Sequence, residues 1–356
     1  MSSYFDERNE KTLAAIDGIL DTLPSFAREF NVGISMRTSP LTRLGYLRDI
    51  RVFCDYLSRK RFKNKSATEI TLADLSELTP TDIEAYIDYL SSYTLDGKKH
   101  SCKEYAKSRK VSSLRAMFKY FYKKEKLASD VMTKVDTPKT HLKPIIRLDV
   151  DEVVEFLDEA ESGENLVGRQ KSFHKQTALR DEAMLSLFLG TGIRISECVG
   201  LNRKDVNFND NSFVVTRKGG NTTVLYFSDE VANALKRYID WLDEQIAEQT
   251  PFGSRITDRD ALFVSSKGGR ITPRAVELMV KKYASVTTPF KRITPHKLRS
   301  TYGTNLYHET HDIFVVADVL GHKDVNTTRK HYAAMSDEIR RDVVNKIKLR
   351  DKDDDN

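Results

Sequence analysis

The chain has 356 residues, of which 39% are hydrophobic and 31% charged. This length fits two domains with cores of their own, and 17 Phe and 15 Tyr residues are too many for a disordered chain. No apolar run reaches the ~20 residues of a membrane span, and residues 1–11 lack the apolar segment of a secretory signal. The composition therefore predicts a globular, two-domain protein outside the membrane.

The three cysteines, Cys54, Cys102 and Cys198, lie far apart in the sequence. Their spacing favours neither a disulfide framework nor a zinc site, and it fits the reducing cytoplasm. We also find no carboxylate cluster with metal-ligand spacing, since the acidic run at 353–355 is typical of a solubilising end. No metal site is predicted.

The net charge is +6, and the basic residues are concentrated in one segment. Residues 97–128 contain eleven Lys and Arg against two Glu. A concentrated basic surface is typical of proteins that bind polyanions, while the alternative is a solvated helix face. The candidates for DNA contacts are Lys107, Arg109, Lys110 and Arg115.

In chain order, residues 1–135 read as four helices. Apolar residues recur at steps of three and four over 12–23, from Ser39-Pro40 to 57, from Thr79-Pro80 to 90, and along the basic segment near 104–122. Ser or Thr before Pro is a helix start signal. The last helix has an apolar face of Val111, Leu114, Phe118, Phe121 and Tyr122, with its basic residues expected on the other faces.

Residues 136–148 contain two prolines and no helical period, which predicts a linker. A second domain is expected over 149–356. We predict helices over 150–157, 179–189, 193–201, 231–246, 272–283, 296–308, 313–320, 326–332 and 337–349, and a polar loop over 161–177.

The strongest β signal lies in the second domain. Residues 213–216 and 222–227 are β-branched and aromatic, and they flank a turn that contains Gly219-Gly220-Asn221. This pattern predicts a hairpin with Lys218 at its tip. The predicted class is mostly α with a small antiparallel β-sheet.

Several cationic and imidazole side chains of this domain lie at predicted helix starts. Arg194 and Glu197 are three residues apart at the start of a helix, so the carboxylate can hold the guanidinium. His296 and Arg299 follow Pro295 at another helix start, where an anion such as phosphate is favoured. A surface salt bridge and a pair of solvated residues are the plain alternatives.

These segments, in this order, resemble the tyrosine recombinase (phage-integrase) family. The family pattern is an Arg in G-[IL]-R-x-S-E, a Lys in a β-turn, H-x-x-R, G-H, and a Tyr nine or ten residues later. This chain has TGIRISE, TRKGGN, HKLRSTYGT and LGH, followed by Tyr332. Its length and the region around 34–57 look most like Xer-type and mobile-element integrases of bacteria.

The resemblance implies a four-helix (SAM-like) core-binding domain and an α+β catalytic domain. It assigns catalysis to Arg194, Lys218, His296, Arg299, His322 and the nucleophile Tyr332, with Glu197 supporting Arg194. The implied reaction is site-specific cleavage and rejoining of duplex DNA through a 3′-phosphotyrosyl intermediate, without cofactor or metal. It serves chromosome-dimer resolution, or integration and excision of a mobile element.

The resemblance also implies an assembly. The apolar stripe of the predicted helix 337–349 would dock into a neighbouring protomer and close a homotetramer on two sites, from a monomer free in solution. The alternative is that this helix packs on its own domain. Two other functions are weighed: a type IB topoisomerase-like enzyme, and a helical DNA-binding regulator without chemistry, which leaves the six site residues unexplained.

Overall fold

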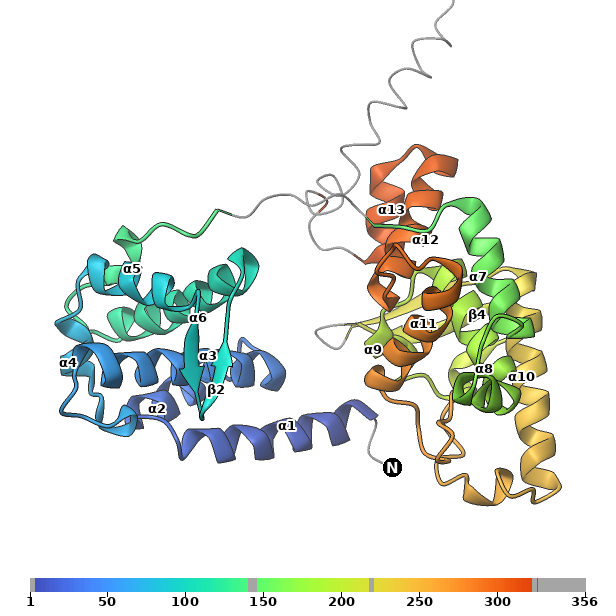
Figure 1. Cartoon of the computed structure of the whole chain (residues 1–356), viewed down its shortest axis with the longest axis horizontal. Coiled ribbons are helices and arrows are strands. Elements are labelled where there is room, and N and C mark those ends of the chain that lie inside the picture. The colour runs from blue at the N-terminus through green and yellow to red at the C-terminus, as the bar shows by residue number, and fades with distance from the viewer. Residues whose placement is uncertain (1–3, 140–145, 218–220, 322–324, 326–356) are drawn as a thin grey trace, which may run out of the picture. The chain divides into compact units, whose positions relative to one another are not determined.

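The computed structural model describes residues 4–139, 146–217, 221–321 and 325. The chain divides into two compact units, residues 1–143 and 144–356, and the division falls inside the predicted linker (Figure 1). Each unit is described by itself.

The first unit is helical, with one small hairpin. Its elements are α1 (Tyr4–Leu20), α2 (Ser25–Gly33), α3 (Pro40–Tyr56), α4 (Leu72–Ser76), α5 (Pro80–Tyr89), β1 (Tyr93–Leu95), β2 (Lys98–His100) and α6 (Glu104–Lys123). The four predicted helices correspond to α1, α3, α5 and α6. Ser39 and Thr79 cap α3 and α5 as their sequence signals predicted.

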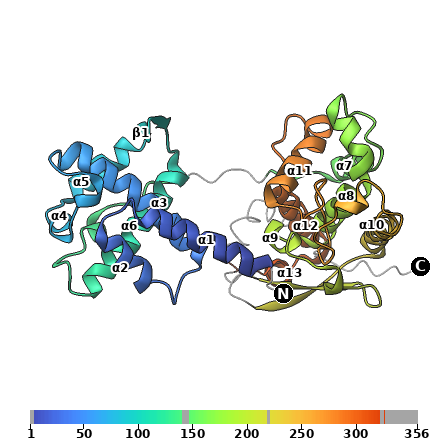
Figure 2. The same cartoon turned by 90° about the horizontal axis from the view of Figure 1, so that it is seen from below.

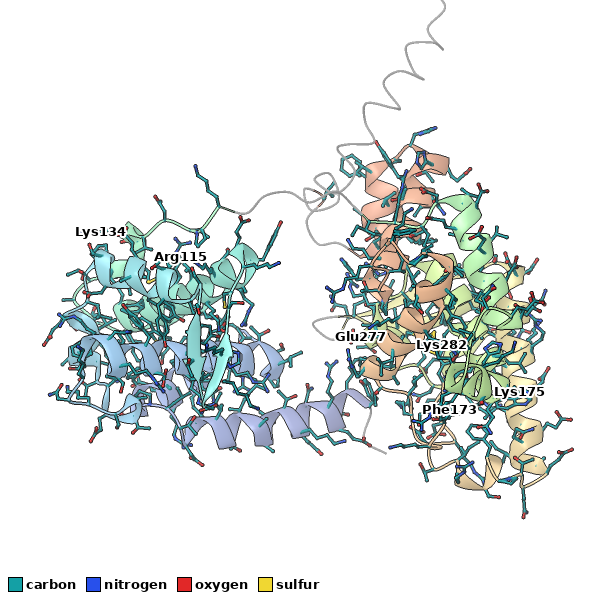
Figure 3. The ribbon with its side chains drawn as sticks, in the orientation of Figure 1. Arg115, Lys134, Phe173, Lys175, Glu277 and Lys282 are labelled. Carbon is teal, nitrogen blue, oxygen red and sulfur yellow. The ribbon has the colours of Figure 1, made fainter. Side chains whose placement is uncertain are left out.

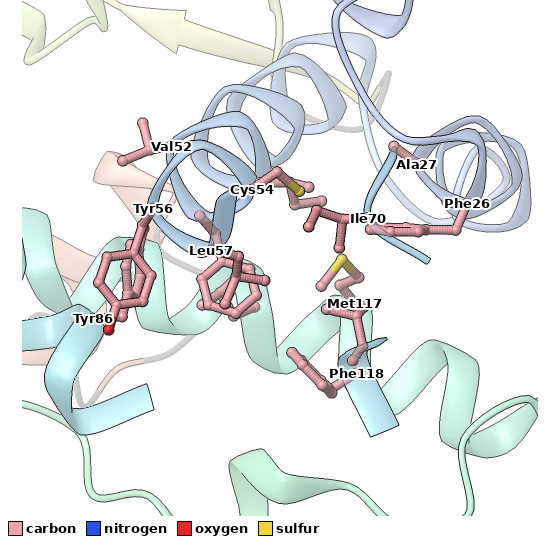
Figure 4. Packing of buried hydrophobic residues seen from close by; sticks show 14 of the residues in the cluster. Phe26, Ala27, Val52, Cys54, Tyr56, Leu57, Ile70, Tyr86, Met117 and Phe118 are labelled. Atoms are coloured by element: carbon pink, nitrogen blue, oxygen red, sulfur yellow. The ribbon is translucent and has the colours of Figure 1, made fainter. Parts of the chain in front are cut away.

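The core of this unit lies between α3 and α6, which pack against each other. Phe53 of α3 meets Phe118 of α6 edge to face, with ring centroids 6.4 Å apart, and both rings are buried. Figure 4 shows Met117 and Phe118 of α6 facing this cluster. The hairpin β1–β2 was not predicted, although its turn is an Asp96-Gly97 pair, both with positive φ, which is a strong hairpin signal.

The second unit combines helices with a three-stranded antiparallel sheet. Its elements are α7 (Val150–Ser162), α8 (Arg169–Thr191), α9 (Ile195–Cys198), β3 (Val206–Asn207), β4 (Ser212–Thr216), β5 (Thr222–Tyr226), α10 (Asp229–Ala247), α11 (Pro273–Thr287), α12 (Pro295–Thr310) and α13 (Ile313–Leu320). The central helix α8 packs against α7, α10 and α12. Figure 2 shows the strands at one margin of the unit, on the opposite side from α7 and α11.

The predicted hairpin is present as β4 and β5. The register pairs Phe213 with Leu225, both buried, and Val214 with Val224, both exposed. This alternation follows from the two-residue period of a strand that covers a core with one face only. The predicted fold class, mostly α with a small antiparallel sheet, is therefore confirmed.

The predicted loop at 161–177 is wrong, because α8 begins at Arg169. Its first turns carry a stripe of polar rather than apolar buried residues: His174, Thr177 and Asp181, at steps of three and four. Their polar atoms are satisfied, since Thr177 donates to Asp181 at 2.9 Å. A hydropathy pattern misses such a stripe. Phe173 and Lys175, labelled in Figure 3, lie beside it on the exposed faces of α8.

The predicted helix at 193–201 is only one turn long. α9 ends at Cys198, and the chain turns so that Asn202 forms an isolated β-bridge with Ala261. Arg194 is the N-cap of this helix, which has only four residues.

Candidate active site

Arg194 stands at the N-terminal cap of α9 and is held there by Glu197. Its Nη1 donates to Glu197 Oε1 at 2.8 Å, and its backbone N–H donates to Oε2 at 3.0 Å. The Glu197 side chain is 4% exposed and that of Arg194 33%. One carboxylate therefore fixes both the backbone and the guanidinium of Arg194, which remains partly open to solvent. This is the contact that the sequence predicted.

Arg299 lies on α12, and its side chain is buried rather than solvated. The residue is 6% exposed. Its Nη1 donates to the carbonyl of Gly192, and its Nη2 donates to that of Leu320. A buried guanidinium is costly unless its donors are satisfied. The burial of Arg299 therefore argues against the solvated-residue alternative.

The two arginines meet at the C-terminal end of α13. Arg194 Nη2 donates to Leu320 O at 3.2 Å and to Gly321 O at 3.0 Å. Leu320 O thus accepts from both guanidinium groups. The last carbonyls of a helix lack intrahelical donors and carry partial negative charge, which favours cations there. The end of α13 thereby holds two like charges side by side.

Gly192 connects this arrangement to α8. The residue ends α8 with φ 62°, in the left-handed region that favours glycine. A Cβ at this position would also overlap the ring of Tyr302. Because Gly192 O accepts from Arg299, the sharp turn between α8 and α9 brings Arg194 and Arg299 to one place.

His296 lies one turn before Arg299 on α12 and is exposed. It follows Pro295, which stands in the first turn of the helix as predicted. The spacing of three residues places the imidazole and the guanidinium on one side of α12.

Three predicted site residues, Lys218, His322 and Tyr332, lie outside the described residues. Their chain neighbours are described for two of them: Arg217 precedes Lys218, and Gly321 precedes His322. Arg217 Nη2 donates to Val319 O at 2.9 Å, so the end of β4 reaches the last turn of α13. Sequence reasoning missed Arg217, because no local pattern distinguishes it from an ordinary turn residue.

Cys198 directly follows Glu197 but does not offer a competing nucleophile. Its side chain is buried, and burial together with the nearby Glu197 raises the pKa of the thiol far above its ordinary value. The thiolate is the reactive form of cysteine. Cys198 therefore acts as a core residue, and all three cysteines are free of disulfides.

The four predicted DNA contacts on α6 differ in their surroundings. Lys107 and Arg109 are at least partly exposed, and the Arg109 side chain is 57% exposed although it donates to Asp49 at 2.6 Å. Arg115, labelled in Figure 3, donates to Val135 O at 2.6 Å and also to Thr137 Oγ1. Its guanidinium therefore holds the segment that follows α6 against that helix.

Lys110 is the exception, and its prediction as a free basic side chain is wrong. It is 6% exposed, and its Nζ donates to the buried Asp49 at 2.8 Å. Ser113, one turn further, donates to the same carboxylate at 2.7 Å. Lys110 thus lies on the inner face of α6, where a charge is tolerated because it is paired.

Within the described ranges, no group of three or more His, Cys, Asp or Glu side chains is placed to hold a metal ion. In the same ranges, every helix is too short or too polar to cross a bilayer. The site at the end of α13 is built from the guanidinium groups of Arg194 and Arg299, whose fixed charges can neutralise a phosphate.

Comparisons with known proteins match this chain to one family. Residues 147–338 match the model of the phage integrase family. Tyrosine recombinase XerS of Streptococcus agalactiae is 32% identical over 93% of this chain and 98% of its own length. Tyrosine recombinase XerC of Syntrophus aciditrophicus is 29% identical over 86% of this chain and 92% of its own.

A solved structure shares the fold. The XerH site-specific recombinase bound to palindromic difH substrate, in a post-cleavage complex, superposes with a TM-score of 0.63 at 18% identity, over 86% of this chain and 80% of its own. The chain belongs to the phage integrase family, as a site-specific tyrosine recombinase. The predicted family, fold and class of enzyme are confirmed, and these relatives give no support to the topoisomerase-like alternative.

Proposed function

We propose that this enzyme cleaves and rejoins duplex DNA with Tyr332 as nucleophile and Arg194 and Arg299 as the clamp on the scissile phosphate. The observation that carries the proposal is the meeting of the two guanidinium groups at the end of α13. Each guanidinium can offer paired donors to phosphate oxygens. We propose that it acts on DNA in a bacterial cytoplasm, in chromosome-dimer resolution or in movement of a mobile element, since its relatives are named tyrosine recombinases of bacteria.

The proposed reaction needs no external energy source, because bonds are exchanged rather than hydrolysed. The Tyr332 oxygen bonds to phosphorus as the bond from phosphorus to the 5′ oxygen breaks, and Lys218 gives a proton to that leaving oxygen. Negative charge builds on the non-bridging oxygens, where Arg194 and Arg299 stabilise it. His296 and His322 add hydrogen bonds or proton transfer near neutral pH. Attack by another 5′-hydroxyl reverses the steps.

A nicked duplex that carries the recombination site tests this chemistry. Cleavage near the nick releases a short fragment, so the covalent protein–DNA adduct accumulates and survives a denaturing gel. We expect the adduct with this protein. A DNA-binding regulator gives none, and a topoisomerase-like enzyme also relaxes plasmid that lacks the site.

Exposed basic residues of α6 are proposed to contact phosphates. Replacement of Lys107 and Arg109 by Gln should weaken DNA binding and flatten its salt dependence, by about one unit of slope for each phosphate that no longer has a cationic partner. The measurement is the binding constant at several salt concentrations. An unchanged slope in the double variant contradicts the assignment.

Lys110 provides the matched control on the same helix. Lys110→Met should leave the salt slope unchanged and lower the melting temperature, since Asp49 loses a buried partner. A slope that falls with Lys110→Met as much as with Lys107 and Arg109 would mean that the inner face of α6 opens on DNA.

We further propose that the enzyme assembles as a homotetramer on two sites through the predicted helix 337–349, which lies outside the described residues. Truncation after residue 336 should leave monomer binding to a half-site intact and abolish cooperative binding to the full site, together with strand exchange. Gel-shift titrations on half and full sites measure both. A truncated protein that is unfolded in solution would place the helix in its own domain.

A further inference from the structure

Arg217 joins two elements that are remote in sequence. It follows β4 directly, and its guanidinium donates to Asp318 O at 3.4 Å and to Val319 O at 2.9 Å, in the last turn of α13. Its backbone N–H donates to Asn221 O at 2.7 Å, which closes the base of the hairpin turn. The same residue therefore anchors the turn from within the hairpin and from α13.

The contact depends on a glycine at the end of α13. Gly321 has φ 61°, in the left-handed region, and any Cβ built there would overlap the Arg217 guanidinium. The guanidinium therefore lies directly against the backbone of Gly321. A residue larger than glycine at position 321 would therefore collide with the Arg217 side chain.

Arg217 is the third guanidinium at one helix end. Arg194 and Arg299 take the carbonyls of Leu320 and Gly321, while Arg217 takes the two carbonyls before them. Burial lowers the pKa of the Arg217 guanidinium below its ordinary value. The positive charge of Arg194 lowers this pKa further, and the negative charge of Glu197 opposes both effects. Its buried Nε has no hydrogen-bond partner among the described residues. A costly placement of this kind is typical of functional sites.

We propose that Arg217 is a positioning residue that fixes the hairpin turn against the end of α13, and thereby holds Lys218 in register with Arg194 and Arg299. Arg217 acts through Lys218, which follows it in the chain, because Arg217 holds the base of the hairpin turn through its backbone and the end of α13 through its side chain. The inference rests on the proposed function, in which Lys218 protonates the leaving 5′ oxygen.

A change of leaving group tests this role. When sulfur replaces the bridging 5′ oxygen, the thiolate leaves without a proton, so loss of the general acid no longer matters. Arg217→Ala should slow adduct formation on the oxygen substrate at least tenfold, since general acids contribute about 10²–10⁴-fold. It should approach wild type on the sulfur substrate. Lys218→Ala should behave alike, whereas Arg299→Ala should stay slow on both substrates.

Two further measurements separate positioning from phosphate binding and from simple destabilisation. The variant Arg217→Ala/Lys218→Ala should be no slower than Lys218→Ala on the oxygen substrate, because both changes remove one function. Half-site affinity and its salt slope should match wild type. A slope reduced by about one unit would assign Arg217 to a phosphate and overturn the proposal.

If Arg217→Ala does not fold, as judged by thermal unfolding, Arg217→Gln takes its place, since Gln keeps polarity but is too short for both carbonyls.

The outcomes distinguish the two levels of inference. Absence of any adduct with the wild-type enzyme on either substrate would overturn the proposed function itself. If the wild-type enzyme forms the adduct but the Arg217 variant is equally slow on the oxygen and sulfur substrates, or unaffected on both, only the positioning role would be overturned.

Discussion

Tyr332→Phe should abolish the covalent adduct with a nicked site while DNA binding and thermal stability stay at wild-type levels. The change removes only the phenolic oxygen that attacks phosphorus, and a Phe ring cannot form the same bond. An ordinary tyrosine pKa is about 10, so the fixed cations and a neighbouring base must favour loss of its proton. The measurement is a denaturing gel, with half-site binding measured in parallel.

Tyr226→Phe is the matched control for this prediction. Tyr226 ends β5 and is 69% exposed, so the loss of its hydroxyl should change neither fold nor adduct. An adduct that persists in Tyr332→Phe would assign attack to another tyrosine, and peptide mapping of the adduct would identify it.

Arg194→Ala and Arg299→Ala should each slow cleavage by on the order of 10²–10³-fold, because each removes a preorganised donor from the phosphate. Arg→Lys should rescue poorly at both positions. Arg299 spans from Gly192 O to Leu320 O with two nitrogens, and one ammonium cannot make both contacts. Single-turnover adduct formation measures the rates.

Thermal unfolding must accompany these rates, since Arg299→Ala leaves the Gly192 carbonyl without its side-chain donor at a cost of about 1–3 kcal/mol, whereas Leu320 O keeps Arg194 as a donor. Arg203→Ala is the control in the same unit. Arg203 pairs with Asp243, which is 53% exposed, and exposed pairs contribute about 0–1 kcal/mol. Near-wild-type cleavage by Arg194→Lys or Arg299→Lys would contradict the phosphate clamp.

The elements that the sequence predicted well are those whose signals are local. The Ser39-Pro40 and Thr79-Pro80 pairs correctly predicted the starts of α3 and α5. Each capping side chain accepts from a backbone N–H only three residues further on, so the signal is local. The hairpin of β4 and β5 followed from alternation and a glycine turn. The order of motifs from Arg194 to Tyr332 was equally a property of the sequence, and it indicated the family.

Tertiary structure decided the features that depend on partners from distant segments. The local sequence around Lys110 is typical of a surface lysine, but its ammonium group is buried because it pairs with Asp49, 61 residues away. The start of α8 looked like a loop because its buried stripe is polar and is satisfied within the fold, as when Tyr283 of α11 donates to Asp181 at 2.8 Å. No single segment contains either explanation.

The sequence by itself determined which residue types are available for phosphate chemistry and where each helix or strand that carries them begins. Only the fold decided that Arg194, Arg217 and Arg299, separated by up to 105 positions, share the carbonyls at the end of α13. The physical reason is that capping and periodicity act over a few residues. The convergence of three charges instead depends on the path of the whole backbone, and on two glycines, Gly192 and Gly321, that let it turn.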